Sequence, residues 1–367
     1  MRTIGLIELY AHSEVLRTYL RVMRVAGFAL KVFCSQVVAK DLQAEATFQS
    51  TPHKIMRDKE SRPQFIRRCR TQLEQCDLLI FITLTSNFFF FSRLRLSPPQ
   101  LLIIHNGYTF LSPCPNLHFR HPLTDRLRLL RQWLKGEWFF RQRMLRNMSY
   151  LSFPSPTLQI HLQQQGLLKS YSIGPVLPFG YYEGSPQATP PKRLNIVVPG
   201  AVSEEGRSYR DICDAIRRAV PRLKQPIRLI LLGRVKEQPD EMLFALLEDC
   251  DRSLFELKYY EDLVPQEEFD RQLQQADFLL LPLKKHLQFG IIREYYGYSN
   301  ISGGINDWLR FGHAAIISSH YPLEPALEKL CQRYRDRAEL AELIVQWVNE
   351  KTYQRMRSQA PLLLEED

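Results

Sequence analysis

Short apolar runs alternate along this chain with segments in which apolar residues recur at helical spacing. In the first half, Thr3–Leu9, Phe28–Ser35 and Asp77–Leu84 are apolar runs, whereas Glu14–Ala26 repeats apolar side chains three and four residues apart. That spacing predicts an amphipathic helix between the first two runs. Apolar strands separated by helices are typical of parallel sheets covered on both faces. The pattern therefore predicts an α/β fold.

The same alternation continues to the end of the chain. Further strands are expected at Leu101–His105, Leu194–Pro199, Ile227–Gly233, Asp277–Pro282 and Ala314–Ser318, and further helices at Gln64–Gln75, Tyr209–Val220, Pro265–Ala276, Ile305–Phe311 and Ala338–Met356. Proline, glycine and serine gather between residues 178 and 192, which indicates a boundary between domains. We expect a first domain over residues 1–180, a second over 181–345, and a C-terminal helix and tail over 346–367.

Length and composition restrict the class of protein. A chain of 367 residues favours two domains, because one hydrophobic core seldom grows that large. An apolar fraction of 45% and a charged fraction of 24% exclude a largely disordered chain. No run reaches the roughly 20 apolar residues of a membrane-spanning helix. The seven cysteines are scattered and no secretory signal precedes them, so we expect a cytoplasmic protein with no metal site.

Charge divides unevenly between the two halves. Residues 1–183 carry 24 Lys and Arg against 11 Asp and Glu, a balance of +13, while the remainder carries 25 against 28, a balance of −3. The surplus is densest in residues 117–150, where eight basic residues interleave with Trp133, Trp138 and Phe139. Such a mixture suits an amphipathic helix on an anionic membrane surface. A helix that buries these aromatic side chains is the alternative, and without a recognised nucleic-acid module we expect no nucleic-acid partner.

Ser302-Gly303-Gly304-Ile305-Asn306-Asp307 is the strongest local sign of a binding site. Paired glycines at a helix start let a ligand approach the backbone closely, and the amides of a first helical turn attract an anion. Asp307, one turn further along, has the acceptor oxygens to bind a ribose diol. The alternative is an ordinary glycine turn in which Asp307 interacts with the helix dipole.

A second candidate is the loop after Leu194–Pro199, since open α/β sheets bind ligands at the carboxyl ends of their strands. It contains Gly200 and Arg207, whose permanently charged, forked guanidinium suits a diphosphate. Gly233 and Arg234 end the next predicted strand and are expected at the same edge. A solvated loop arginine is the alternative interpretation of Arg207.

Four segments together resemble the donor-binding domain of GT-B glycosyltransferases, particularly family four. They are Val197–Arg207, Leu229–Arg234, Pro265–Pro282 and Ser302–Ser318, in matching order and spacing over about 120 residues. The resemblance implies a GT-B fold, in which two Rossmann-like domains face each other across a cleft and a C-terminal helix packs back across them. The residues implied to bind a nucleotide sugar are Gly200, Arg207, Gly233, Arg234, Lys284, Gly303, Gly304 and Asp307.

Two positions depart from that family's pattern. Ala201 stands where the family usually places an arginine directly after the first glycine. Ser299 stands where the first of two acidic residues is usual, and Glu294 is near but out of register. A non-catalytic GT-B-like scaffold therefore stays open as an alternative.

The amino half resembles the acceptor domain of the same fold more weakly. His12 follows the first predicted strand, and His105 ends the Leu-Leu-Ile-Ile run. A histidine near neutral pKa can hydrogen-bond an acceptor hydroxyl or take its proton, so both are candidate catalytic residues. A strand-end histidine bonded to backbone is the alternative for each.

The resemblance implies a glycosyltransferase that moves a sugar from a nucleoside diphosphate sugar to a hydroxyl acceptor, with retention and without a metal ion or separate cofactor. We expect a glycan or lipid-linked acceptor, a role in cell-surface polysaccharide or glycolipid synthesis, and a cytoplasmic protein that associates with membranes. A nucleotide-sugar epimerase, which needs no acceptor, is a further alternative.

Overall fold

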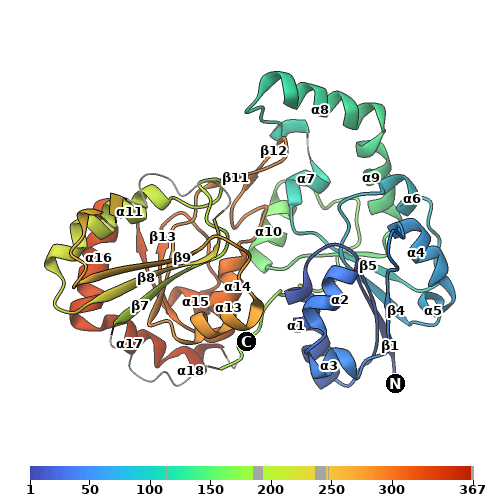
Figure 1. The fold of residues 1–367 in the computed structure, drawn as a ribbon. Helices are drawn as coiled ribbons and strands as arrows, with labels where there is room; N and C mark the ends of the chain where they lie inside the picture. Colours follow the sequence, from blue (N-terminus) through green and yellow to red (C-terminus); the bar gives the residue numbers. More distant parts are fainter. Residues whose placement is uncertain (113, 185–192, 236–244, 247, 365–367) are drawn as a thin grey trace. The chain divides into compact units, whose positions relative to one another are not determined.

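The computed structural model describes residues 1–112, 114–184, 193–235, 245, 246 and 248–364, in two compact units (Figure 1). Unit 1 comprises Met1–Phe179, Phe289–Glu294 and Tyr298–Ile301; unit 2 comprises Gly180–Gln288, Tyr295–Gly297 and Ser302–Asp367. The sequence placed a boundary after residue 180, and the division here follows residue 179. Two short stretches of the second half belong to unit 1, which the sequence did not indicate.

Unit 1 contains a six-stranded, wholly parallel sheet in the order β3-β2-β1-β4-β5-β6. This is the strand order of a Rossmann-like sheet, which starts in the middle and is extended first to one side and then to the other. Its elements are β1 Thr3–Glu8, α1 Ser13–Val25, β2 Ala29–Cys34, α2 Gln36–Leu42, α3 Ala46–Gln49, β3 His53–Ile55, α4 Arg62–Arg68, α5 Arg70–Glu74, β4 Leu78–Thr83, α6 Phe88–Phe91, β5 Gln100–Ile103, α7 Gly107–Leu111, the 3-10 turn Cys114–Asn116, α8 Pro122–Leu134, α9 Glu137–Asn147, β6 Tyr150–Ser152 and α10 Pro156–Gln164.

Unit 2 repeats this architecture. Its parallel sheet has the order β14-β13-β10-β7-β8-β9, so the first strand again lies in the middle. Its elements are β7 Leu194–Pro199, α11 Tyr209–Ala219, the 3-10 turn Val220–Arg222, β8 Ile227–Arg234, β9 Phe255–Tyr260, α13 Gln266–Gln274, β10 Phe278–Leu281, α14 Gly303–Phe311, β13 Ala314–Ser318, α15 Pro325–Glu328, β14 Cys331–Tyr334, α16 Arg337–Glu350, α17 Thr352–Arg357 and α18 Ala360–Leu364. A separate two-stranded sheet pairs β11 His286–Phe289 with β12 Ile292–Tyr295.

Alternate side chains of the central strands supply the core on each face of the sheets. In unit 1, Leu6 and Ile80 pack with α1 and α2, which lie on one face, while α4 and α5 lie on the other (Figure 1). In unit 2, Ile196 and Val198 pack with α11 and α16. Val197, between them, packs on the opposite face with α14. Burial on both faces explains why these strands read as continuous apolar runs.

The same aspartate contact fixes the fourth strand to the first in both units. Asp77 precedes β4, and its Oδ2 accepts a hydrogen bond from the Thr3 amide at 2.7 Å. Asp277 precedes β10, and its Oδ2 accepts the Asn195 amide at 2.8 Å. Each aspartate amide in turn donates to the carbonyl of its partner. The contact sets the register between these strands, whose carboxyl ends carry the candidate residues.

Two helices begin two residues earlier than the sequence predicted. α4 starts at Arg62 because Ser61 and Gln64 form a capping box, each side chain bonded to the other's backbone amide. α14 starts at Gly303, so the two glycines form its first turn instead of preceding it. The predicted helix Ala338–Met356 is two helices, α16 and α17, because Lys351 adopts a left-handed conformation with φ of 55°.

Six of the seven cysteines are buried, all seven are unpaired thiols, and Cys114 is exposed. Trp347 of α16 and Tyr353 of α17 pack in the core of unit 2, and so do Ala360 and Leu364 of α18. In the part of the chain that the structure describes, no helix is both long and apolar enough to cross a bilayer.

Candidate functional site

The candidate site in unit 2 lies at the carboxyl edge of its sheet, where β7 has β8 on one side and β10 on the other. The strand order changes direction here, and in open α/β sheets ligands bind at such a switch point. α14 begins at the same place. A Cβ built on Gly304 would come within 3.3 Å of Leu281 and 3.4 Å of Pro199, the last residues of β10 and β7.

Three of the predicted glycines allow the backbone to pack without side chains at this edge. A Cβ on Gly233 would come within 2.5 Å of the Gly200 carbonyl carbon, so β8 and the loop after β7 touch directly. A Cβ on Gly200, whose φ is 95°, would collide with the guanidinium of Arg207. A Cβ on Gly304 would lie 3.5 Å from Nη2 of Arg207. The structure thus brings Gly200, Gly233, Gly304 and Arg207 together.

Arg207 is a buried cation with little local compensation. Its side chain is 8% exposed, and its Nη1 donates a long hydrogen bond of 3.4 Å to the Ala201 carbonyl. Its Nε is buried without a hydrogen-bond partner among the described residues. Burying an incompletely paired charge is costly, so this position favours an anionic ligand.

The first turn of α14 adds a second feature that suits an anion. Ser302, its N-cap, has a buried Oγ that finds no hydrogen-bond partner in the described parts of the chain, and it does not cap the helix. A Cβ on Gly303 would meet nothing within 4 Å, so the space beside this turn is open. Uncapped amides at the positive end of a helix dipole attract phosphate. Together with Arg207 they form a cradle for a phosphate or diphosphate.

The remaining predicted residues of unit 2 are Asp307, Lys284 and Arg234, and their surroundings differ from one another. Asp307 is half-buried and follows Gly303 by four residues, which places it on the same face of α14. Nζ of Lys284 forms an ion pair of 2.7 Å with Glu204, so its charge is already neutralised. Arg234 is exposed, and its carbonyl accepts the Val202 amide at 3.0 Å.

Ser299, which departs from the family pattern, and the nearby Glu294 are structural in this protein. Ser299 is fully buried and donates a 2.5 Å hydrogen bond to Glu294. Glu294 also accepts the Thr109 amide and hydroxyl, each at 2.7 Å, and the Tyr108 amide at 3.2 Å. Burial, the largest cause, raises the Glu294 pKa above its ordinary value, although these hydrogen bonds lower it. Both residues belong to unit 1, where Glu294 satisfies the first turn of α7.

In unit 1 the corresponding switch point lies between β1 and β4, and the two predicted histidines meet there. The ring centroids of His12 and His105 are 5.0 Å apart. Nε2 of His105 donates a 2.6 Å hydrogen bond to the Ile82 carbonyl, which leaves Nδ1 as the acceptor. Burial lowers the pKa of His105 to about 3, so this ring is neutral at physiological pH.

His12 has the opposite electrostatic surroundings. Its Nδ1 lies 3.0 Å from Oε1 of Glu14, and its side chain is 40% exposed. Burial alone would lower the His12 pKa, but the hydrogen bond that His12 donates to Glu14 and the negative charges of Glu14 and Glu8 outweigh it and raise the pKa. Of the two histidines, His12 is the stronger base.

Glu8 is a further residue at this edge that the sequence interpretation missed. It ends β1 and is fully buried, and its Oε1 accepts the Tyr10 amide at 2.7 Å. Burial raises its pKa, while the hydrogen bond from the Tyr10 amide acts in the opposite direction. The signal was present, because Glu8 is the one charged residue in the strand Thr-Ile-Gly-Leu-Ile-Glu.

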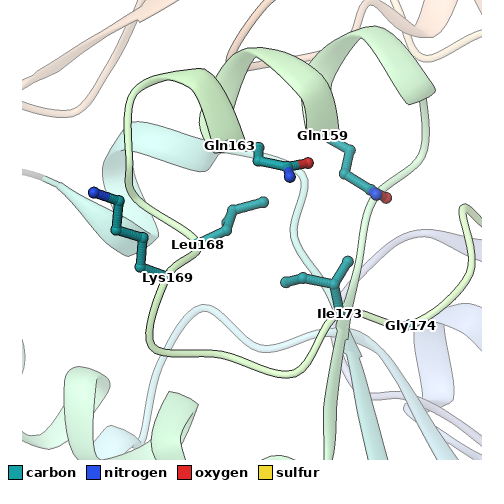
Figure 2. A pocket seen from close by; sticks show the side chains of 6 residues that line it. All are labelled: Gln159, Gln163, Leu168, Lys169, Ile173 and Gly174. Carbon is teal, nitrogen blue, oxygen red and sulfur yellow. The ribbon is translucent and has the colours of Figure 1, made fainter.

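A hollow of about 410 Å³ lies elsewhere in unit 1 (Figure 2). Gln159 and Gln163 project into it from α10, with Leu168, Lys169, Ile173 and Gly174 completing the lining (Figure 2). None of the predicted site residues lines it. Among the residues that the structure describes, no group of three or more His, Cys, Asp and Glu side chains is arranged to hold a metal ion.

No family model matches the chain, and no curated protein matches it. Solved structures do match over almost their whole length. The pneumococcal O-GlcNAc transferase GtfA, in complex with UDP and GlcNAc, has a TM-score of 0.60 at 10% identity, with 100% of this chain and 96% of that chain covered. Anabaena HepE in complex with UDP has a TM-score of 0.59 at 13% identity, with 100% and 95% covered. A putative UDP-N-acetylglucosamine 2-epimerase from Listeria monocytogenes has a TM-score of 0.50 at 12% identity, with 98% and 92% covered.

At these identities the similarity concerns the fold. It extends over both units, each of which has a Rossmann-like parallel sheet. The chain therefore has the GT-B fold, with two Rossmann-like α/β domains.

Proposed function

We propose that this protein is a glycosyltransferase that moves a sugar from a nucleoside diphosphate sugar to a hydroxyl acceptor. The observation that carries the proposal is the cradle in unit 2, where Arg207 and the open first turn of α14 lie at the switch point of the sheet. The diphosphate binds against Arg207 and the amides of Gly303 and Gly304. Asp307, on the same face of α14, binds the ribose hydroxyls.

In the proposed reaction, the bond between the anomeric carbon and the β-phosphate oxygen breaks as a new bond to the acceptor oxygen forms. The departing diphosphate gains negative charge, which preorganised positive groups stabilise best. Arg207 and the positive end of α14 supply that stabilisation, so the proposed reaction needs no metal ion. Lys284 contributes less, because Glu204 neutralises it. The resemblance to family four supports retention of the anomeric configuration, and membership of that family is part of this proposal.

We assign the acceptor side of the reaction to the switch point of unit 1. His12 is partly exposed and is the more basic histidine, so it binds the acceptor hydroxyl or takes its proton. Neutral His105 is held by the Ile82 carbonyl and packs beside His12. The acceptor is a glycan or a lipid-linked glycan, in the synthesis of a cell-surface polysaccharide or glycolipid.

Thermal unfolding with UDP, GDP and ADP tests the donor site. A nucleotide that binds the folded chain stabilises it by about 2.7 kcal/mol at a hundredfold excess over Kd. We expect one of the three to raise the melting temperature, and Asp307→Ala to remove the rise. Asp41→Ala, an exposed aspartate in unit 1, is the matched control and should keep it. Failure of all three nucleotides to stabilise the wild-type protein contradicts the donor site.

The likeness to the Listeria protein named as an epimerase favours nucleotide-sugar epimerisation as a second candidate. An epimerase converts the nucleotide sugar without any acceptor, so product analysis in the absence of acceptor distinguishes the two. A non-catalytic scaffold, suggested by Ala201 and Ser299, would bind its ligand yet release no nucleotide with any acceptor.

A further inference from the structure

α8 is a 13-residue helix of unit 1 in which no side chain is buried. It runs along the outside of the unit and leads into α9 (Figure 1). Five of its six large apolar side chains are between 50% and 79% exposed: Leu123, Leu127, Leu130, Trp133 and Leu134. Singly exposed leucines are ordinary, but five large apolar side chains on one short helix mark an interaction surface.

The leucines form one stripe that faces away from the body of unit 1. Leu123, Leu127, Leu130 and Leu134 are separated by four, three and four residues, which places them along one side of a helix. The half-covered residues of α8 are Asp125, Leu129 and Gln132, and this spacing places them on the opposite side. The helix therefore contacts the rest of unit 1 through the side opposite the leucines, and its apolar stripe faces outward.

Basic residues border the stripe on both sides. On a helical projection, Arg126 lies on one flank and Arg131 on the other, and Lys135 follows at the C-terminal end. All three are exposed. Residues 117–150 as a whole carry eight Lys and Arg against two Asp and Glu. An apolar stripe with a basic border, and a tryptophan beside it, matches the surface of an anionic bilayer.

We propose that α8 docks this protein on an anionic phospholipid bilayer, with the leucine stripe in the acyl–headgroup boundary and the basic residues at the phosphates. A helix of this length spans about 20 Å, less than the roughly 30 Å hydrocarbon core, so it lies in the surface and does not cross it. Leucines facing outward favour lipid over nucleic acid, because phosphate backbones are bound by charged groups.

A second copy of the chain is a poorer occupant of the stripe. An antiparallel two-fold contact centred on it would place the Arg126 side chains of the two copies along one flank and the two Arg131 side chains along the other. Like charges facing each other across an interface oppose association. An anionic membrane has the complementary charge instead.

Vesicle sedimentation tests the proposal with the full chain. We expect pelleting with phosphatidylcholine–phosphatidylglycerol vesicles and much less with phosphatidylcholine alone. Leu127→Ser with Leu130→Ser should abolish pelleting, and Arg126→Gln with Arg131→Gln should weaken it about thirtyfold on anionic vesicles, since each basic residue near such a surface contributes about fivefold. Leu263→Ser with Leu362→Ser, at positions 82% and 71% exposed outside α8, is the matched control and should pellet like wild type.

Three outcomes overturn the proposal. The wild-type protein could remain in the supernatant with both kinds of vesicle, or the α8 variants could pellet as well as the control. Sedimentation velocity could also show a wild-type dimer that the leucine variant dissociates, which would assign the stripe to a second copy. Because no α8 side chain is buried, the variants should keep the wild-type melting temperature and nucleotide affinity, so a failure of membrane binding is distinguishable from a failure of the donor site.

Discussion

The imidazole rings of His12 and His105 lie 5.0 Å apart, yet their pKa values shift in opposite directions. His105 is covered by Phe179 and donates to the Ile82 carbonyl, and burial keeps it neutral. His12 is partly exposed and lies beside Glu14, whose carboxylate favours the imidazolium. Two adjacent titratable groups held in different states suit different roles. We therefore assign proton transfer, or the hydrogen bond to the acceptor, to His12 and its positioning to His105.

Glu14→Gln is expected to lower the pKa of His12, because it removes the carboxylate that stabilises the imidazolium. If His12 acts as a neutral base, the acidic limb of kcat/KM against pH should move to lower pH by roughly half a unit to one unit. His12→Gln should lower kcat about a hundredfold. Glu74→Gln, at an exposed ion pair elsewhere in unit 1, is the control and should leave the limb in place. An unchanged limb in Glu14→Gln would remove His12 from the proton transfer.

Much of the fold could be predicted because most of the central strands contain an apolar run long enough to be recognised from the sequence alone. β7 and β13 were predicted to the residue, since apolar runs buried on both faces end abruptly at proline or serine. The strands β3, β6, β9 and β14 of the two large sheets were missed, and so was the pair β11 and β12. β3 has three residues, all exposed, and β9 is mostly half-buried, so neither has an apolar run to detect.

The residues of the candidate site that lie at strand ends could be predicted from the sequence. The contacts between residues far apart in the sequence could not. Gly200, Arg207, Gly233 and Gly304 meet because carboxyl ends of parallel strands share an edge. The neutralisation of Lys284 by Glu204, 80 residues away, has no local signal. Neither does the assignment of Glu294 to unit 1, since it requires knowing that residues 289–294 leave their own half of the sequence.

Gly303→Val is expected to weaken nucleotide binding without unfolding the chain. A Cβ at Gly303 meets nothing within 4 Å, so the helix accommodates it, but the side chain would occupy the space proposed for the diphosphate. Calorimetry should show a Kd at least about tenfold higher, equivalent to roughly 1.4 kcal/mol. Gln36→Val, also at the first residue of a helix and exposed, should leave the affinity unchanged. Wild-type affinity in Gly303→Val would exclude the first turn of α14 from the donor site.

Gly233→Ala is expected to destabilise the protein by about 1–3 kcal/mol, the usual cost of overpacking. The added Cβ meets the Gly200 backbone, which cannot rotate away as a side chain would. Denaturant unfolding followed by circular dichroism gives the free energy of unfolding. Gly303→Ala is the matched control, because its new methyl group enters open space and a helix favours Ala over Gly. Equal stability of the two variants would contradict the close approach of β8 to the loop after β7.

Glu294→Gln is expected to change how stability depends on pH. Burial raises the Glu294 pKa above its ordinary value of 4.5, so the folded chain holds this proton more tightly than the unfolded chain does. Stability is therefore highest below 4.5 for this group, and it falls as the pH rises from there through the raised pKa. Glutamine cannot ionise, so in urea unfolding at a series of pH values the variant should lose this fall in stability.

The Glu294→Gln variant should also be less stable than wild type at low pH by roughly 1 kcal/mol, because its amide nitrogen cannot accept a hydrogen bond from the Tyr108 amide. Glu261→Gln, at an exposed site, supplies the comparison, and identical slopes for Glu294→Gln and wild type would show that burial of Glu294 does not govern its ionisation.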